Sequence, residues 1–235
     1  MIKISFTFAR SAPLQYLSHL DMMRLFHRAL RRSGLPLAYS QGFNPHLRFN
    51  LAVPLPLGVT ASQEFGEVYL SLPLSAEHFL AVLRPQLPPG LQLKSAAIED
   101  TDAQSRASII NAALYLATWA SMNQFEPVPL AMQEALDRIM DKTEILAPRV
   151  SKKAKTTYVN VRPFIIEVKL EHPAGEPLIV SLLLHAGGQG GVSPSFVLDK
   201  LGLELAGLHA PFWNLHREGL YIYRDGLVQS VPEGM

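Results

Sequence analysis

Hydrophobic and polar positions alternate at the start of the chain and then change period. The apolar positions of the first segment are Ile2, Ile4, Phe6 and Phe8. This spacing of two residues predicts a half-buried strand over residues 1–9. Beyond it the pattern becomes helical. Ser18 can cap a helix that begins near His19, with Asp21 in its first turn, and Gly34 is expected to end it.

The predicted helix separates apolar packing from positive charge. With successive residues 100° apart, one arc holds Met22, Leu25, Phe26, Ala29 and Leu30. The opposite arc holds Arg24, His27, Arg28, Arg31 and Arg32. The first arc is therefore expected to pack against a sheet, and the second to face outward.

The remaining pattern repeats a strand–helix–strand–strand–helix–strand order. In the first half, extended segments are predicted at residues 35–39, 47–53, 64–72 and 91–98, with a second helix at 76–87. In the second half, strands are predicted at 109–119, 156–161, 164–170, 178–185 and 220–223, with helices at 129–141 and from Ser193-Pro194 onward. The order predicts an α+β protein made of two tandem ferredoxin-like (split βαβ) sandwiches, with antiparallel sheets and helices on one face. The predicted domains are residues 1–100 and 108–235, joined by the polar segment 99–107.

Composition excludes several classes of protein. The chain has 235 residues and no cysteine, so disulfides, thiolate zinc sites, cysteine nucleophiles and a cysteine-ligated iron–sulfur cluster are excluded. No apolar run approaches the roughly 18–20 residues that a membrane span needs. The start of the chain alternates like a strand and not like a signal peptide. A cytoplasmic protein without a membrane-spanning segment is therefore predicted.

The net charge of +1 conceals a basic N-terminal region. Residues 1–60 contain seven Lys and Arg residues against the single acid Asp21, a local net charge of +6. Such an excess can guide a polyanion to one part of a nearly neutral chain. The alternative is a solvated helix face whose arginines pair with acids elsewhere, for example in the acidic segment 61–150. A shorter basic run at Lys152, Lys153 and Lys155 could extend the same surface.

A stiff turn follows the predicted helix at residues 42–46, Gly-Phe-Asn-Pro-His. Gly42 permits positive φ, Asn44 tolerates it, and Pro45 restricts its neighbours. One interpretation is a rigid loop that stacks on or orients a ligand through Phe43 and His46. The other is a structural hairpin connection in which Phe43 is buried.

Three histidines, His19, His27 and His46, are candidates for acid–base catalysis. His19 and His27 are eight residues apart, which does not match the one-turn spacing of a helical metal pair, and no carboxylate pair accompanies them. No metal site is predicted. The comparison with metal-independent RNA-cleaving sandwiches rests on fold analogy alone.

The stretch SHLDMMRLFHRALRRSGLPLAYSQGFNPH, followed by Leu-Pro-Leu-Gly at residues 55–58, resembles a bacterial family of radical-SAM-linked proteins with a DUF2344-type domain. The resemblance covers residues 6–72, and Val-Asn-Val-Arg-Pro at 159–163 extends it in general pattern. Leu47 stands where the family has a second proline after His46. Members occur as separate chains or fused to B12-binding radical SAM proteins. The resemblance therefore implies a radical SAM partner, which would itself carry the iron–sulfur cluster and S-adenosylmethionine.

These observations predict an accessory RNA-binding protein, acting on tRNA or rRNA, that presents substrate to a radical SAM enzyme and needs no cofactor of its own. The predicted nucleic-acid-binding residues are Arg24, His27, Arg28, Arg31, Arg32, Tyr39, Phe43, Asn44, His46 and Arg48. One alternative is a metal-independent RNA-processing or RNA-modifying enzyme that uses His19, His27 or His46. Another is a protein-interaction scaffold whose basic face docks on an acidic surface of the radical SAM partner. The sequence does not determine the oligomeric state.

Overall fold

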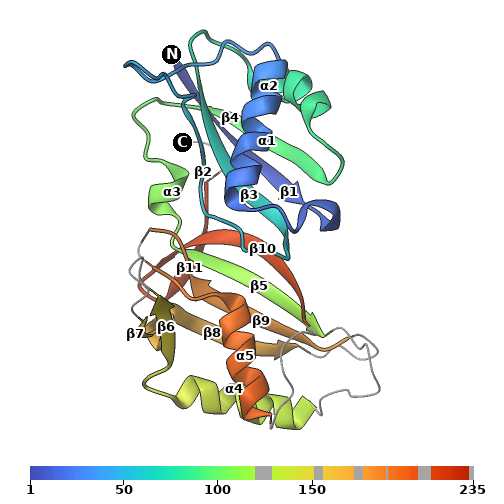
Figure 1. Ribbon diagram of the computed structural model, residues 1–235, viewed down its shortest axis with the longest axis vertical. Coiled ribbons are helices and arrows are strands. Elements are labelled where there is room, and N and C mark those ends of the chain that lie inside the picture. The colour runs from blue at the N-terminus through green and yellow to red at the C-terminus, as the bar shows by residue number, and fades with distance from the viewer. Residues whose placement is uncertain (120–128, 151–155, 172–176, 189, 206–212, 233–235) are drawn as a thin grey trace. The chain divides into compact units, whose positions relative to one another are not determined.

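The computed structural model describes residues 1–119, 129–150, 156–171, 177–188, 190–205 and 213–232, which form two compact units (Figure 1). The first unit consists of Met1–Asn111 together with Arg217–Met235, and the second is Ala112–His216. The predicted second domain, 108–235, differs from this division because its C-terminal segment belongs to the first unit. The physical reason is Arg217, whose guanidinium is buried against the carboxylate of Glu64 in the first unit.

The first unit has the ferredoxin-like element order that the sequence predicts. Its elements are β1 (Ile2–Arg10), η1 (Ala12–Leu14), α1 (His19–Arg32), β2 (Phe49–Leu51), β3 (Val59–Leu70), α2 (Ala76–Leu83), η2 (Arg84–Gln86), β4 (Leu91–Glu99) and α3 (Arg106–Ile109). The strands lie in the order β4-β1-β3, β2 pairs with the C-terminal part of β3, and all these pairings are antiparallel. Figure 1 shows α1 and α2 on the same face of this sheet. The α+β class is confirmed.

The core of the first unit is an aromatic cluster between β1 and the two helices. The Phe6 ring lies at its centre, with its centroid 5.6 Å from that of Phe26 and 5.7 Å from that of Phe79. The alternation predicted for β1 places this ring on the helix-covered face. Gly66 on β3 leaves room for it, since a Cβ at that position would lie 2.4 Å from the Phe6 Cζ atom. The sheet and helices are therefore fixed around one large side chain.

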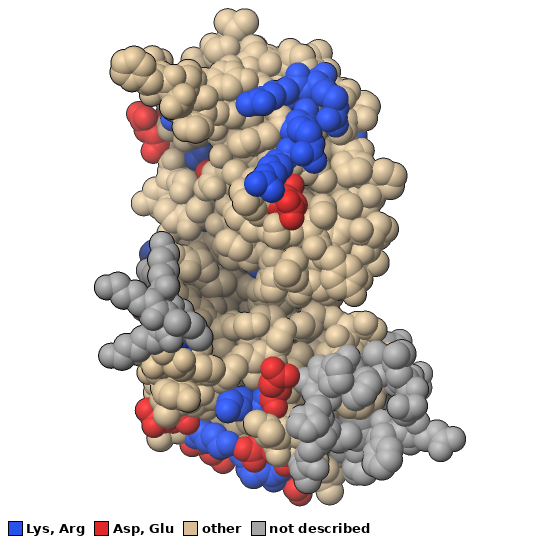
Figure 2. All heavy atoms as spheres, in the orientation of Figure 1, with Lys and Arg blue, Asp and Glu red and all other residues tan. Residues whose placement is uncertain are grey.

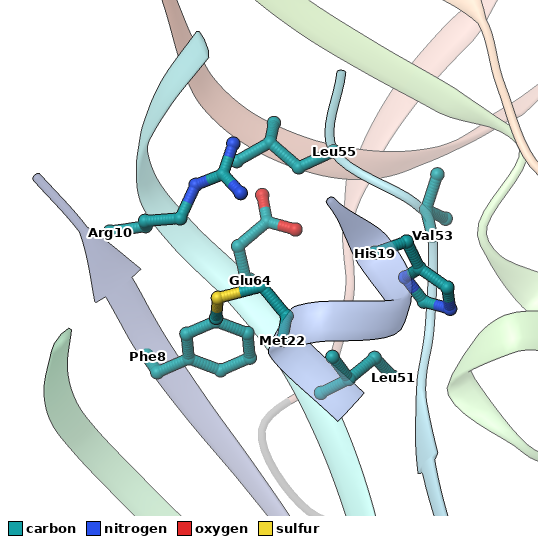
Figure 3. A pocket seen from close by; sticks show the side chains of 8 residues that line it. All are labelled: Phe8, Arg10, His19, Met22, Leu51, Val53, Leu55 and Glu64. Carbon is teal, nitrogen blue, oxygen red and sulfur yellow. The ribbon is translucent and has the colours of Figure 1, made fainter. Parts of the chain in front are cut away.

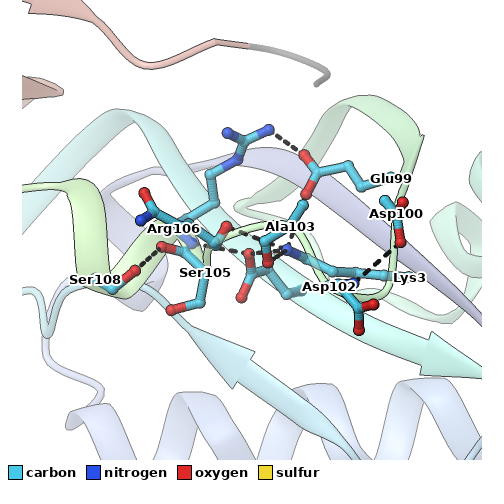
Figure 4. A network of polar contacts seen from close by, with 10 residues as sticks. Lys3, Glu99, Asp100, Asp102, Ala103, Ser105, Arg106 and Ser108 are labelled. Carbon is cyan, nitrogen blue, oxygen red and sulfur yellow. Dashed lines mark hydrogen bonds and ion pairs between the residues drawn. The ribbon is translucent and has the colours of Figure 1, made fainter.

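Polar side chains occupy the other face of β1, yet they are also buried. Lys3 on β1 is fully buried and its ammonium lies 3.2 Å from a carboxylate oxygen of Glu67 and 3.0 Å from one of Glu99 (Figure 4). It also donates to the backbone carbonyls of Ala103 and Gln104. The lysine thus attaches the segment that follows β4 to the sheet.

Arg106 completes this network. Its guanidinium pairs with Glu99, and its backbone N–H donates to Glu67 at 2.8 Å. The side chain is 1% exposed. The prediction of a polar linker at 99–107 is therefore wrong, because this segment's charges and carbonyls satisfy the buried groups of β1, β3 and β4.

The second unit has the strand–helix–strand–strand–helix order with two further strands inserted after its first helix. Its elements are β5 (Ala112–Trp119), α4 (Pro129–Asp141), β6 (Leu146–Val150), β7 (Thr156–Asn160), η3 (Arg162–Phe164), β8 (Ile165–Glu171), β9 (Ile179–His185) and α5 (Pro194–Glu204). β5, β9 and β8 form an antiparallel sheet in that order, and β6 and β7 form a separate two-stranded ribbon between α4 and β8 in the chain. The helix over residues 129–141 is confirmed with the predicted bounds. The ribbon's first strand, β6, was not predicted.

The chain ends in a hairpin of β10 (Trp213–Arg224) and β11 (Leu227–Ser230). β10 is much longer than the predicted strand at 220–223. It is connected to β11 by Asp225 and Gly226, both with positive φ (53° and 80°), which is the backbone that a two-residue hairpin turn requires. The part of β10 in the first unit follows β3 in the sheet order.

Candidate nucleic-acid interface

Helix α1 begins at His19, directly after the N-cap residue Ser18. The Ser18 hydroxyl accepts the Asp21 backbone N–H at 3.1 Å and donates to the Asp21 carboxylate at 2.6 Å. This satisfies one of the free N–H groups of the first turn and places a negative charge at the positive end of the helix dipole. The hydrogen bond from Ser18 is the main reason why the pKa of Asp21 is lowered. The predicted cap and the start at His19 are confirmed.

The opposite faces of α1 have the predicted characters. Met22, Phe26, Ala29 and Leu30 are buried against the sheet, and Leu25 is half-buried at the edge of this contact. Four arginines on the outer face are exposed: Arg24, Arg28, Arg31 and Arg32. In Figure 2 basic side chains form a continuous stripe on the first unit, with acidic atoms at one end. The outer face of the helix is therefore positively charged along most of its length.

The two ends of the stripe are engaged within the protein. Arg24 lies 3.3 Å from the Asp21 carboxylate in an exposed ion pair. Arg32 donates to the backbone carbonyl of Gln86 at 2.6 Å and to its side-chain oxygen at 3.3 Å. Within the described parts of the chain, Arg28 and Arg31 have no hydrogen-bond or ion-pair partner. These two guanidinium groups are available to an external anion.

His27 does not share this exposed face, contrary to the prediction. It is half-buried, its ring packs edge-on against Phe49 with centroids 5.5 Å apart, and its Nε2 atom is buried without a hydrogen-bond partner among the described residues. Burial lowers the pKa of His27, and the nearby charge of Arg31 lowers it further. The side chain is placed to pack in its neutral form and not to contact a phosphate.

This burial predicts acid sensitivity. In the folded state the pKa of His27 lies below its usual 6.5, so the unfolded chain binds a proton first as the pH falls. The stabilisation is present above pH 6.5 and is lost as the pH drops towards the lower folded-state pKa. We expect the free energy of unfolding, measured by urea denaturation, to decrease between pH 7.5 and 5. The decrease should be smaller in His27→Leu.

Burial also lowers the pKa of His19, so a residual pH dependence is expected in the His27→Leu variant. Arg28→Ala, one position along and on the exposed face, is the matched control and should retain the full dependence. An identical pH dependence in His27→Leu and the native protein would contradict the assignment to His27.

The turn at residues 42–46 is closed by hydrogen bonds at its base. The Ser40 backbone N–H donates to the His46 carbonyl at 2.8 Å, and the His46 N–H donates to the Ser40 hydroxyl at 2.9 Å. Tyr39 and Leu47 form a β-bridge beneath them. Gly42 has a φ of 125°, a region in which side chains are strained. The loop is therefore closed at its base by hydrogen bonds and a β-bridge, and its stiffness stays a prediction.

Phe43 at the tip of this loop is fully exposed, with a relative accessibility of 105%. The structural alternative, in which Phe43 is buried under a hairpin, is wrong. Asn44 and His46 are also exposed, and Tyr39 is 40% exposed. An aromatic ring held in solvent by a loop closed at its base is suited to stacking, because little side-chain or loop freedom is lost on binding.

Arg48 lies apart from the helix stripe and is already stacked. Its guanidinium lies 3.9 Å from the centroid of the Tyr69 ring, and the side chain is half-buried. The structure thus gathers Arg24, Arg28, Arg31 and Arg32 on one helix face, and Phe43, Asn44 and His46 on one loop. Within the first unit's described residues, no hydrogen bond, ion pair or ring contact joins the side chains of these two groups.

The three candidate catalytic histidines occupy three different settings. His27 packs on Phe49, His46 is at the base of the exposed loop, and His19 lines a small pocket between α1 and the sheet (Figure 3). No hydrogen bond links any two of them among the residues that the structure describes. The geometry does not form an acid–base pair from these side chains.

Two basic residues of the N-terminal excess are interior, which charge counting did not detect. Lys3 is buried against Glu67 and Glu99, and Arg10 is 2% exposed. The exposed basic surface is therefore smaller than the local +6 suggests. Arg10 continues the spacing of Ile2, Ile4, Phe6 and Phe8 and so is in register with the predicted buried face, whereas Lys3 lies on the opposite face and gave no such signal. The basic run at Lys152, Lys153 and Lys155 lies outside the described residues.

The described residues lack two features that would indicate other functions. No group of three or more His, Asp or Glu side chains there could hold a metal ion. No helix in the same ranges is long and apolar enough to cross a membrane.

The family model DUF2344, described as an uncharacterized protein conserved in bacteria, matches residues 3–194. The chain belongs to this family. The match extends well beyond residues 6–72, on which the sequence resemblance rests, and includes parts of both units. The description of DUF2344 names no reaction, ligand or partner.

Comparison with curated proteins finds no match for this DUF2344 chain. Among solved structures, it is similar to a chain of a Cbf5–Nop10–Gar1 complex, with a TM-score of 0.50 and 10% sequence identity. The similarity covers 92% of this chain and 48% of that one, so this chain spans about half the length of its structural neighbour. At this identity the likeness shows the fold alone, and it agrees with the α+β class.

Proposed function

We propose that this protein is a cytoplasmic accessory protein that binds RNA through the outer face of α1 and presents it to a radical SAM enzyme. The observation that carries the proposal is the pair Arg28 and Arg31, which are exposed, adjacent on one helix face and without partners among the described residues. A planar guanidinium donates two parallel hydrogen bonds to phosphate oxygens, so such a stripe is suited to a nucleic-acid backbone.

The loop at residues 42–46 supplies the second part of the proposed surface. It contains no Lys, Arg, Asp or Glu and holds Phe43 in solvent. Arginines attract the backbone without regard to sequence, whereas an exposed aromatic ring can stack on an unpaired base. Asn44 and His46 beside it offer hydrogen-bonding groups for base edges. We propose that the arginines supply most of the affinity and that the loop favours unpaired regions of tRNA or rRNA.

The radical SAM partner in this proposal comes from the sequence resemblance. With no cysteine, the chain has no thiolate to ligate an iron–sulfur cluster, so the cluster and S-adenosylmethionine would belong to the partner. No side-chain arrangement in the described residues favours catalysis by this chain. The proposal therefore assigns it substrate binding and leaves the chemistry to the partner.

Charge reversal of the two arginines tests the proposal. Arg28→Glu/Arg31→Glu removes two charge-assisted hydrogen-bonding interactions of about 1.5–3 kcal/mol each and adds repulsion, so the affinity should fall about 100-fold or more. Filter binding of total tRNA and rRNA, measured across a salt series, checks this. In the native protein the logarithm of affinity should fall steeply with the logarithm of salt. The slope should decrease by about 0.7 for each phosphate that the variant no longer neutralises.

The matched control reverses the same amount of charge elsewhere on the first unit. Lys94→Glu/Arg224→Glu alters two exposed residues outside α1. Its affinity for RNA should stay within about twofold of the native value, because salt screens charges that do not contact the RNA. Equal loss of affinity in both double variants would show that only the net charge of the protein matters. Unchanged affinity in the α1 variant would reject the outer face of α1 as the RNA-binding interface. If the α1 variant loses a nuclease-resistant complex with the partner protein but keeps RNA binding, the scaffold alternative is correct.

A further inference from the structure

The ribbon of β6 and β7 in the second unit is largely exposed to solvent (Figure 1). The two strands pair with each other and not with the sheet of β5, β9 and β8. A two-stranded ribbon is only marginally stable unless something else supports it. Its side chains are half-buried at Ala147, Val159 and Asn160, and exposed at Leu146, Pro148, Arg149, Thr156, Thr157 and Tyr158. Most of the ribbon surface is therefore accessible to a ligand.

The support of the ribbon lies at its base. Ile145 and Val161, which flank the two strands, are buried, and the Val161 N–H donates to the Ile145 carbonyl at 2.8 Å. The side-chain oxygen of Asn160 accepts the backbone N–H groups of Ile145 and Arg162, both at 3.0 Å. The Arg162 guanidinium donates to the carbonyl of Met140 in α4 at 2.8 Å. The base is thus attached to the second unit, and the strands extend from it.

One face of the ribbon presents an exposed aromatic ring beside a proline. The register places Pro148 directly opposite Tyr158, with Leu146 two residues along on the same face. Because Val161 bonds to Ile145, the alternation of an antiparallel ladder makes Pro148 and Tyr158 a non-hydrogen-bonded pair. Side chains approach most closely at such a pair, and the missing N–H of proline breaks no ladder bond there. Tyr158 is nevertheless 67% exposed.

The charge around this face is entirely positive. Residues 145–161 contain four basic residues and no Asp or Glu, a local net charge of +4. Arg149 is exposed, and its guanidinium has no hydrogen-bond or ion-pair partner among the residues that the structure describes. The other three charges belong to the Ser-Lys-Lys-Ala-Lys sequence that connects the strands. An unbalanced charge of this size attracts a polyanion.

We propose that the β6–β7 ribbon binds single-stranded RNA, with a base stacked on Tyr158 beside Pro148 and the phosphate backbone attracted by the positive charge of the ribbon. A single strand combines a polyanionic backbone with accessible flat bases, whereas the bases of a duplex are already stacked on one another. This site lies in the second unit and uses neither Arg28 nor Arg31. The inference therefore does not rest on the interface proposed for α1.

Photo-crosslinking of the full chain to an oligouridylate of about 12 nucleotides containing 4-thiouridine tests this binding. Mass spectrometry of the digested product should place a crosslink on β7. Crosslinking there, measured against protein concentration, reports the affinity of this site alone. The half-maximal concentration should rise about fivefold or more in Tyr158→Ala, which removes the stacking ring, and change less than about twofold in Tyr158→Phe, which keeps it.

Leu130→Ala is the matched control, because Leu130 is a 70% exposed apolar residue on α4 of the same unit. It should leave the crosslink unchanged. Excess unlabelled oligouridylate should compete for the site, and duplex RNA of the same length should compete much less. Far-UV circular dichroism of each variant confirms that the fold is retained.

Absence of a crosslink on β7 in the native protein would overturn the inference, as would equal half-maximal concentrations in Tyr158→Ala and Leu130→Ala. Competition by duplex RNA as effective as that by the single strand would show attraction by charge without stacking, and would overturn it also. The crosslink on β7 should persist in Arg28→Glu/Arg31→Glu. If that variant keeps its full RNA affinity as well, the α1 interface is rejected while the ribbon site stands. If it loses affinity and the native protein gives no crosslink on β7, the reverse holds.

Discussion

Replacing Arg217 with methionine is expected to lower the free energy of unfolding of the first unit by about 3–5 kcal/mol. The side chain is fully buried, pairs with both oxygens of Glu64, and donates to the backbone carbonyls of Val53 and Pro54. Removing it leaves a buried carboxylate and the carbonyls of Val53 and Pro54, of which the first is buried, without these donors. Urea denaturation followed by far-UV circular dichroism measures the loss, and amide hydrogen exchange in β3 assigns it to this unit.

The double variant Glu64→Leu/Arg217→Met separates the cost of an unpaired charge from the value of the pair. Because both charges are removed together, part of the stability lost in Arg217→Met should be regained. The recovery should be incomplete, since Arg10 loses the attraction of the Glu64 carboxylate. A loss below about 1 kcal/mol in Arg217→Met would show that water reaches Glu64, in contradiction to its burial.

A loss of similar size, about 3–5 kcal/mol, is expected from Lys3→Met. Methionine fills much of the same volume but leaves Glu67 and Glu99 without the ammonium group, so that Arg106, which pairs with Glu99, is the remaining buried cation of the network (Figure 4). It also removes the donor to the carbonyls of Ala103 and Gln104. We therefore expect the loss of stability to be accompanied by faster amide exchange in the segment that follows β4.

Lys94→Met on β4 provides the control for this second experiment. Lys94 is exposed, and its substitution should change the free energy of unfolding by less than about 0.5 kcal/mol. If Lys3→Met and Lys94→Met are equally mild, the ammonium group of Lys3 is not held between the two carboxylates. If stability falls without faster exchange after β4, the attachment of that segment does not depend on Lys3.

Local patterns predicted most elements of the first unit, but the predicted extended segment 35–39 forms only isolated bridges, at Leu37 and Tyr39. The Ser18 cap, the apolar arc of α1 and the alternation of β1 are all properties of nearby residues, and each was found as expected. The exposure of Phe43 was one of two alternatives that the sequence left open, since a turn sequence determines backbone shape but not what packs against it. The position of His27 was predicted wrongly because its burial depends on Phe49, which lies beyond the helix.

Pairings between distant segments could not be predicted from local patterns. The partners of Lys3 and Arg217 lie far along the chain, so a charge count did not reveal that both cations are internal. β6 contains Pro148, which is uncommon within strands and obscured the ribbon. By contrast, Asp225-Gly226 is a strong hairpin signal, and it could have revealed the β10–β11 hairpin.

The division of the chain also has a consequence for its synthesis. The first unit is built from two separate stretches, Met1–Asn111 and Arg217–Met235, with the whole second unit between them. During translation Glu64 is made long before Arg217, so the first unit carries an unmatched carboxylate while the intervening residues emerge from the ribosome. The second unit is contiguous and can complete its fold first, although it is encoded later than most of the first. Until Arg217 and the rest of β10 have been synthesised, the first unit therefore lacks its last strand and the cation that pairs with Glu64.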